Sequence, residues 1–210
     1  MEPDFWLARW REGRIGFHEG RPNAYLERHI AVLGPPGRVL VPLCGKAEDL
    51  AWLAARGHEV VGVELSEVGA RAYFAEHDAL PSETRAGAFT RLTAGRVTIL
   101  VGDIFDLGAA EVVGVTAFYD RAALIALTPI HRRRYVAQLR RLLPGTPGLV
   151  ITFEYDPTLM QPPPHPVGEP EVRALYAGGR VAEIDGGPAD SPRLRELGAS
   201  AYERCFAISL

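Results

Sequence analysis

Short apolar runs that alternate with helical segments constrain the fold of this chain more than any other feature of its sequence. The runs consist mainly of Val, Leu, Ile and aromatic residues, and they lie at residues 38–43, 59–63, 97–101, 115–119 and 149–155. Runs of this kind are typical of strands buried on both faces, as in parallel sheets. The alternation predicts an α/β fold: a Rossmann-like, doubly wound, mostly parallel sheet.

Helix signals lie between and around these runs. Apolar residues recur at helical spacing in residues 4–11, 24–32, 48–56, 66–77, 128–143 and 169–176. Ser66 is a suitable N-cap, and Pro129 occupies a first helical position. The arginine run at residues 132–134 is interpreted as a solvated helix face. The tail, residues 180–185 and 201–210, predicts an antiparallel hairpin, so the C-terminal strand should be antiparallel.

Two stretches fit no regular element. One is residues 81–95. The other is residues 156–170, which holds six of the 17 prolines. Long proline-rich segments in a compact domain are usually functional loops, so we expect irregular structure in both stretches.

Length and composition narrow the class of protein. The 210 residues suit a single domain, 1–210, in which residues 1–36 form an N-terminal helical cap over the active site. A net charge of −3 argues against a nucleic-acid partner. The sequence has no stretch of 18 apolar residues, so no membrane span is predicted. No signal peptide is recognisable, and a cytoplasmic location is therefore expected. The two cysteines have no metal-binding spacing, and no metal site is predicted.

The residues at the strand ends are where a doubly wound sheet binds its ligand. Gly45 follows the first strand, and Glu64 ends the second strand 19 positions later, which suits a carboxylate that accepts hydrogen bonds from ribose hydroxyls. Asp103, after the third strand, can reach an adenine amino group. The chain lacks GxGxxG, and Glu48 and Asp49 would repel a pyrophosphate at the next helix start. S-adenosylmethionine, a sulfonium without phosphate, therefore fits better than a nicotinamide cofactor.

Seven short motifs are spread along the chain. Two are specific in combination, VPLCGK at residues 41–46 and GHEVVGVELSE at residues 57–67. The others are FWLARW at 5–10, IGFH at 15–18, DIFD at 103–106, YDRAAL at 119–124 and YDP at 155–157. Over nearly the whole chain these motifs resemble the thiopurine S-methyltransferase family, in its bacterial branch.

The resemblance implies a class I methyltransferase that transfers the methyl group of S-adenosylmethionine to the sulfur of an aromatic or heterocyclic thiol and releases S-adenosylhomocysteine. Bacterial relatives also methylate selenium and tellurium compounds. The residues that the resemblance places at S-adenosylmethionine are Trp10, Leu43, Glu64 and Arg121, with Asp103, Ile104 and Phe105 lining its adenine pocket. Phe17 would bridge the cofactor and substrate sites, and Arg121 would also face the substrate.

The chain departs from the family pattern in two places. His165 stands at or near a position where many relatives have an aromatic residue. Residues 81–95 have no clear match. Both segments are expected to touch the substrate pocket, so substrate identity is the part of the resemblance that is least constrained.

Two residues are expected to act directly on the reaction, Arg121 and Phe17. Methyl transfer from a sulfonium is an in-line displacement, so its main requirement is alignment. A heterocyclic thiol is largely anionic near neutral pH and needs no strong base. Arg121 would lower the pKa of the thiol by favouring the thiolate, while Phe17 and Trp10 would form aromatic walls.

Several of these residues also have simpler interpretations. Trp10 suits the core of an N-terminal helix, Glu64 suits a helix cap, and Asp120 suits a cap or a group that orients Arg121. Cys44 is interpreted as a small loop residue and His18 as a group that fixes its loop. As a whole, the chain could instead be a non-catalytic S-adenosylmethionine-binding protein or a dehydrogenase. A monomer that acts on a small thiol or metalloid compound is the preferred interpretation.

Lys46 is the only lysine among 23 basic residues. Codon bias explains the excess of arginine, but it does not explain why the exception directly follows Gly45. We expect Lys46 to serve a local need, as a flexible cation against Glu48 or Asp49.

Overall fold

The computed structural model describes residues 3–16, 18–121, 123–189 and 191–210. The chain divides into two compact units, Glu2–Tyr119 and Asp120–Leu210. Among the described residues, no helix is both long enough and apolar enough to cross a membrane.

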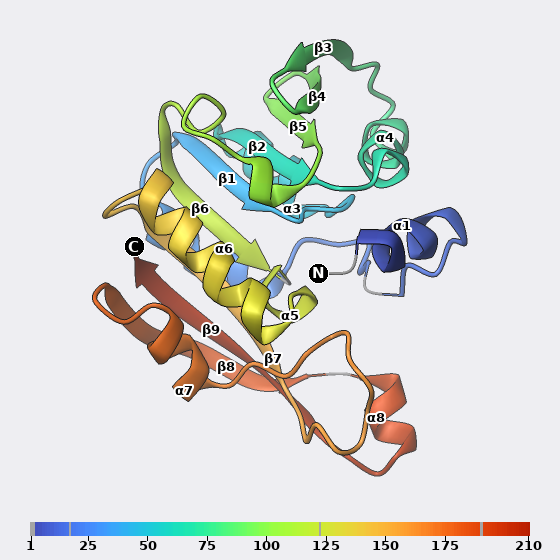
Figure 1. Ribbon diagram of the computed structural model, residues 1–210, viewed down its shortest axis with the longest axis vertical. Coiled ribbons are helices and arrows are strands. Elements are labelled where there is room, and N and C mark those ends of the chain that lie inside the picture. Colours follow the sequence, from blue (N-terminus) through green and yellow to red (C-terminus); the bar gives the residue numbers. More distant parts are fainter. Residues whose placement is uncertain (1–2, 17, 122, 190) are drawn as a thin grey trace. The chain divides into compact units, whose positions relative to one another are not determined.

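Four parallel strands carry the predicted apolar runs. They are β1 (Arg38–Pro42), β2 (Glu59–Glu64), β5 (Val97–Val101) and β6 (Val115–Arg121), in the order β5-β2-β1-β6 (Figure 1). The chain runs outward from β1 to β2 and β5, and then returns to β6 on the other side of β1. The strand order therefore reverses at β1, where a doubly wound sheet binds its ligand. The predicted α/β fold is confirmed.

The helices that connect these strands also follow the prediction. Helix α3 (Asp49–Ala55) joins β1 to β2, and α4 (Glu67–Glu76) follows β2. The Ser66 hydroxyl accepts a hydrogen bond from the Gly69 N–H at 3.3 Å, so Ser66 is the N-cap of α4.

The N-terminal segment forms three short helices, α1 (Pro3–Arg11), α2 (Ala24–His29) and the 3₁₀ helix η1 (Ile30–Leu33). Asn23 caps α2 through a hydrogen bond that its side-chain oxygen accepts from the Tyr25 N–H at 2.9 Å. The predicted helix 24–32 is thus divided into an α-helical and a 3₁₀ part. The buried hydrophobic side chains of these three helices are Trp10, Tyr25, Leu26 and Leu33.

Residues 81–95, expected to be irregular, form an antiparallel hairpin instead. Strands β3 (Ser82–Ala86) and β4 (Phe89–Ala94) pair with each other, and β4 pairs with β5. The two-residue turn is possible because Gly87 adopts a φ of +58°. Strand β3 is an edge strand with mostly exposed, charged residues, so it lacks the apolar alternation by which strands are recognised.

The unit Asp120–Leu210 is built around three antiparallel strands, β7 (Pro147–Glu154), β8 (Arg180–Ala189) and β9 (Ala201–Ser209), in the order β7-β9-β8. The predicted C-terminal hairpin is confirmed, although helix α8 (Pro192–Glu196), which was not predicted, lies between its strands. Arg204 on β9 pairs with Glu154 on β7 at 2.7 Å and with Glu183 on β8 at 2.8 Å.

Helices α5 (Ala123–Ala126), α6 (Pro129–Leu142) and α7 (Glu169–Leu175) complete this unit. The arginine run in α6 is not entirely solvated, which corrects the expectation. Arg133 and Arg134 are exposed, but Arg132 is only 2% exposed. Its Nε donates to the carbonyl oxygens of Leu124 and Leu127, which lie within α5 and directly after it. The buried guanidinium therefore has hydrogen-bond partners at the end of that helix.

The proline-rich segment before α7 is irregular, as predicted. The Tyr155 hydroxyl donates to the Pro164 carbonyl oxygen at 2.7 Å, and the His165 N–H donates to the Ile125 carbonyl oxygen at 2.7 Å. These bonds attach the segment to the end of β7 and to α5.

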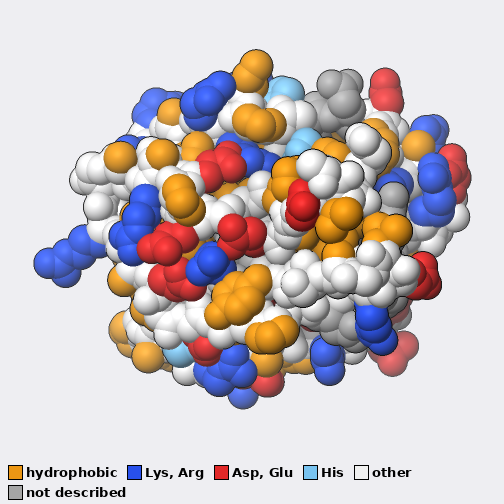
Figure 2. Space-filling view, turned by 90° about the horizontal axis from the view of Figure 1, so that it is seen from below, with side chains coloured by type: hydrophobic (Ala, Val, Ile, Leu, Met, Phe, Trp, Pro, Cys, Tyr) orange, Lys and Arg blue, Asp and Glu red, His pale blue; other side chains and the backbone are white. Residues whose placement is uncertain are grey.

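Charged side chains of both signs are interspersed on the surface that Figure 2 shows. Several form ion pairs on single elements, such as Arg71 with Glu67 on α4 and Arg173 with Glu169 on α7. Exposed pairs of this kind contribute little to stability, so the fold depends mainly on its buried strands.

Candidate functional site

Residues 43–48, the switch-point loop, connect β1 to α3 at the reversal of strand order. Leu43 and Gly45 adopt positive φ angles of 48° and 54°. The Cys44 N–H donates to the Val63 carbonyl oxygen at 3.0 Å, which attaches the loop to β2. Positive φ is easy for glycine but uncommon for leucine, so the contacts around the loop must hold its conformation.

Glu64, the last residue of β2, holds this loop through its carboxylate. Oε2 accepts a hydrogen bond from the Gly45 N–H at 2.9 Å, and Oε1 accepts one from the Ser66 N–H at 2.7 Å. Glu64 is only 7% exposed. Burial raises the pKa of Glu64 to about 7, although the hydrogen bonds that the carboxylate accepts from backbone N–H groups act to lower it. The carboxylate thus joins the switch-point loop to the start of α4.

Trp10 from α1 packs on the same loop. A Cβ atom at Gly45 would lie 3.3 Å from the indole ring, and one at Gly69 of α4 would lie 2.8 Å from it. Trp10 is therefore a buried residue of the N-terminal helix, and its ring also covers the switch-point loop. The interpretation of Trp10 as a core residue of the N-terminal helix is confirmed.

Asp103, Ile104 and Phe105 follow β5 and begin the 3₁₀ helix η2 (Ile104–Asp106). The Asp103 carboxylate accepts a hydrogen bond from the Phe105 N–H at 2.9 Å, Ile104 is buried and Phe105 is half-buried. The preceding Gly102 N–H donates to the Glu64 carbonyl oxygen at 2.9 Å. The ends of β1, β2 and β5 therefore bring the predicted residues Gly45, Glu64 and Asp103 to one edge.

Asp49 was predicted to repel a pyrophosphate, but its carboxylate is fully buried. It accepts hydrogen bonds from the Asn23 N–H at 2.7 Å and from the Tyr119 hydroxyl at 3.1 Å. These bonds join the N-cap of α2, the first turn of α3 and β6. Sequence reasoning did not identify this structural role, because the partners lie 26 and 70 positions away.

The two residues expected to act on the substrate, Arg121 and Phe17, have fewer described contacts than the residues around the switch-point loop. Arg121 is the last residue of β6 and half-buried. Phe17 lies outside the described residues. The neighbouring Asp120 is fully buried, accepts hydrogen bonds from the Tyr135 hydroxyl at 2.8 Å and the Ala123 N–H at 3.0 Å, and so caps α5, as one interpretation of the sequence held. Burial raises the pKa of Asp120 to about 6.

Cys44 is buried in the switch-point loop. Burial, together with the nearby Glu64 charge, raises the pKa of its thiol well above the usual value. A thiol that stays protonated is a poor nucleophile, which supports the interpretation of Cys44 as a small loop residue.

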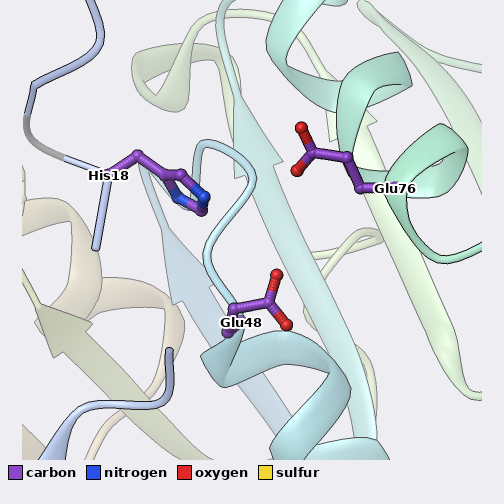
Figure 3. Close-up of side chains that lie close together, drawn as sticks. All are labelled: His18, Glu48 and Glu76. Carbon is purple, nitrogen blue, oxygen red and sulfur yellow. The ribbon is translucent and has the colours of Figure 1, made fainter. Parts of the chain in front are cut away.

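A group of charged side chains surrounds the end of α4, and we refer to His18, Lys46, Glu48, Glu76 and His77 as the charged cluster. One ring nitrogen of His18 and one oxygen each of Glu48 and Glu76 lie within 4.8 Å of one another (Figure 3). Lys46 forms an ion pair with Glu76, and His77 Nε2 lies 3.2 Å from Glu48. We expected Lys46 to pair with Glu48 or Asp49. This expectation was wrong, because Lys46 pairs with Glu76, which lies 30 positions away in the sequence.

Comparisons with known proteins identify the family of this chain. The family model described as Thiopurine S-methyltransferase matches residues 1–206. A thiopurine S-methyltransferase of Pseudomonas aeruginosa (strain UCBPP-PA14) is 48% identical over 191 residues, which are 89% of this chain and 88% of that protein. One of Pseudomonas entomophila is 43% identical over the full length of both chains.

The fold recurs in solved methyltransferases. The structure of a Burkholderia thailandensis 1,6-didemethyltoxoflavin-N1-methyltransferase, with bound 1,6-didemethyltoxoflavin and S-adenosylhomocysteine, superposes with a TM-score of 0.63 at 19% identity. The match covers 98% of this chain and 86% of that one. The chain thus belongs to the thiopurine S-methyltransferase family and is an S-adenosylmethionine-dependent methyltransferase.

Proposed function

We propose that this methyltransferase acts on the sulfur of an aromatic or heterocyclic thiol, such as a thiopurine, and releases S-adenosylhomocysteine. The observation that carries the proposal is the alignment, at 43–48% identity and over most or all of the chain, with proteins named for that reaction. The half-buried Arg121 at the end of β6 is consistent with it, because a cation suits an anionic sulfur.

The residues at the switch-point loop fit S-adenosylmethionine. Each oxygen of Glu64 accepts one backbone N–H and retains a lone pair for a ribose hydroxyl. Gly45 presents no Cβ, and the Trp10 ring packs beside it. In the proposed arrangement, Trp10, Leu43, Gly45 and Glu64 would hold the cofactor, together with Arg121. Asp103, Ile104 and Phe105 would line its adenine pocket.

When bound, S-adenosylmethionine supplies a methyl group on a good leaving group, its sulfonium. The chain then has to align the thiol for in-line displacement and exclude water. Arg121 would hold the thiolate and lower its pKa, and Phe17 would provide an aromatic wall. Asp120, although next to Arg121, is engaged by Tyr135 and by the start of α5, so we assign it no role as a base.

A methyl-transfer assay tests this proposal. Purified protein would be supplied with S-adenosylmethionine and a panel of aryl thiols, thiopurines and selenite, and product formation measured. We expect turnover of at least one aromatic or heterocyclic thiol. Turnover of selenite alone would move the assignment to metalloid compounds. Tight binding of S-adenosylmethionine without any turnover would favour a non-catalytic binding protein.

Arg121→Ala tests the role of the arginine. The substitution should raise the KM for the thiol and reduce kcat/KM by roughly 100-fold, because the thiolate loses its cation. Arg180→Ala, at an exposed position of β8, is the matched control and should have no effect. Unchanged thiol kinetics in Arg121→Ala would remove Arg121 from the mechanism.

The remaining expectations complete the proposal. We propose that the chain works as a monomer in the cytoplasm, as a single domain whose residues 1–36 cap the active site. The net charge of −3 favours a small-molecule substrate over a nucleic acid. Size-exclusion chromatography with light scattering would test the monomer.

A further inference from the structure

The charged cluster has the donor types of a metal centre, one imidazole and two carboxylates. However, its cation is already supplied by the chain. The Lys46 ammonium forms an ion pair with Glu76, and the Lys46 side chain is only 11% exposed. His77 Nε2, 3.2 Å from Glu48, adds a second positive charge when it is protonated. A divalent metal ion would have to displace Lys46 from Glu76.

Lys46 connects two segments that matter for the cofactor. It directly follows Gly45, whose N–H donates to Glu64 at 2.9 Å. Its partner Glu76 is the last residue of α4, the helix whose Gly69 packs against Trp10. The switch-point loop is therefore attached to Glu64 at the end of β2 and, one residue later, to the far end of α4.

We propose that Lys46 is a positioning residue: by pairing with Glu76, it holds the switch-point loop in the conformation that receives S-adenosylmethionine. The proposal rests on the proposed placement of the cofactor at this loop. A ring nitrogen of His18 lies within 4.8 Å of one oxygen each of Glu48 and Glu76, so the segment between α1 and α2 also lies close to this region (Figure 3).

The geometry explains why a lysine stands here in a chain that otherwise uses arginine. A lysine ammonium is a compact point charge on a flexible stem, whereas a guanidinium is a larger planar group, so the two do not fit the same space beside Glu76 equally well. The hydrogen bond from Lys46, and then its charge, lower the pKa of Glu76, with smaller contributions from His18 and His77, which favours the ionised carboxylate as its partner.

The test measures the Kd of S-adenosylmethionine by calorimetry for Lys46→Met, Glu76→Gln and the double variant. Each single variant should weaken binding by about tenfold, an effect within the usual range for coupling between two sites. The double variant should bind about as weakly as either single one, because both substitutions remove the same contact. The KM for S-adenosylmethionine should rise in parallel, while kcat falls less than threefold.

Glu169→Gln is the matched control. It removes an exposed ion pair with Arg173 on α7, a helix that contributes no residue to the switch-point loop or to the charged cluster, and should leave the Kd unchanged. Lys46→Arg keeps the charge with a different shape and should recover only part of the affinity. It also serves as the test variant if Lys46→Met does not fold, which thermal unfolding would show.

Three results would overturn the proposal: wild-type affinity in both single variants, additive losses in the double variant, or an equal loss in Glu169→Gln. Micromolar binding of Zn²⁺ by the wild type that is lost in His18→Ala would identify a metal centre instead, and would also reject it. A wild-type protein that binds S-adenosylmethionine but methylates no thiol would refute the thiol assignment alone, because the Kd measurement needs no thiol.

Discussion

Each of the two units contains a buried carboxylate at or near the end of a strand, and the two carboxylates are held differently. Glu64 accepts hydrogen bonds from the backbone N–H groups of Gly45 and Ser66. Asp120 accepts from backbone N–H groups of α5, among them that of Ala123, and from a side-chain hydroxyl, that of Tyr135. Burial raises the pKa of both carboxyl groups, to about 7 for Glu64 and about 6 for Asp120.

The two carboxylates differ in the segment that each one holds and in the kind of partner that it uses. In Glu2–Tyr119, a backbone-held carboxylate and a tryptophan hold the switch-point loop, so its shape depends on a few buried atoms. In Asp120–Leu210, side-chain partners hold α5, and two hydrogen bonds attach the proline-rich segment. Side-chain partners can be exchanged by substitution more easily than backbone ones. The cofactor loop should therefore be sensitive to small changes, and the segments proposed for the substrate should tolerate more.

Trp10→Ala should have the largest effect. Removing a buried tryptophan costs roughly 3–5 kcal/mol of the unfolding free energy, and it also uncovers Gly45 and Gly69. Chemical denaturation and calorimetry with S-adenosylmethionine should both show a loss. Trp6→Ala, in the same helix but half-buried, should cost less and leave the affinity nearly unchanged. Equal effects of the two substitutions would mean that Trp10 acts only as core.

Glu64→Gln should weaken S-adenosylmethionine binding by roughly 30-fold, equivalent to about 2 kcal/mol, because an amide cannot accept at both of its terminal atoms. It should also change the pH dependence of stability. The raised pKa of Glu64 means that the folded state binds its proton more tightly than the unfolded state. Its contribution to stability is complete below about pH 4.5 and is lost as the pH rises through 7.

Denaturation of the wild type between pH 5 and 8 should therefore show stability that falls with rising pH, and Glu64→Gln should reduce that slope. In Glu64→Gln, the pH dependence of stability that remains should lie at lower pH, around the pKa of about 6 at which Asp120 titrates. An unchanged slope would show that Glu64 is not the group responsible.

Tyr135→Phe should have the smallest effect of the three. It removes one hydrogen bond to a buried carboxylate and should cost about 1–2 kcal/mol of stability. The affinity for S-adenosylmethionine should not change, whereas kcat/KM for the thiol should fall a few-fold because Asp120 precedes Arg121. A loss of cofactor affinity as large as in Glu64→Gln would show that the two carboxylates are not separate in function.

The parallel core could be predicted because its strands are nearly continuous runs of Val, Leu and Ile, and the spacing of Gly45 and Glu64 identified one edge of the sheet. The β3–β4 hairpin could not, because its outer strand is exposed and charged. The buried position of Arg132 was also missed, since its carbonyl partners leave no signal in side-chain periodicity.

Within the candidate site, residue types were easier to predict than partners. Glu64 was expected at ribose hydroxyls, but its bond to the Gly45 N–H follows from local backbone geometry that spacing does not reveal. Lys46 was assigned to its nearest acidic residues, whereas the helix that follows β2 places Glu76, its last residue, beside it. Contacts between residues that are distant in sequence require the folded backbone.

Consecutive residues of β6 also limit how this sequence can change. Tyr119 donates to Asp49, and Asp120, the next residue, accepts from Tyr135. Successive side chains of a strand point to opposite faces, so inserting or deleting one residue just before Tyr119 would exchange the two faces. The Tyr119 hydroxyl would then point to the face that now holds the Asp120 carboxylate, and the Asp120 carboxylate would face Asp49. Substitutions in β6 could be accepted one at a time, but changes in its length could not.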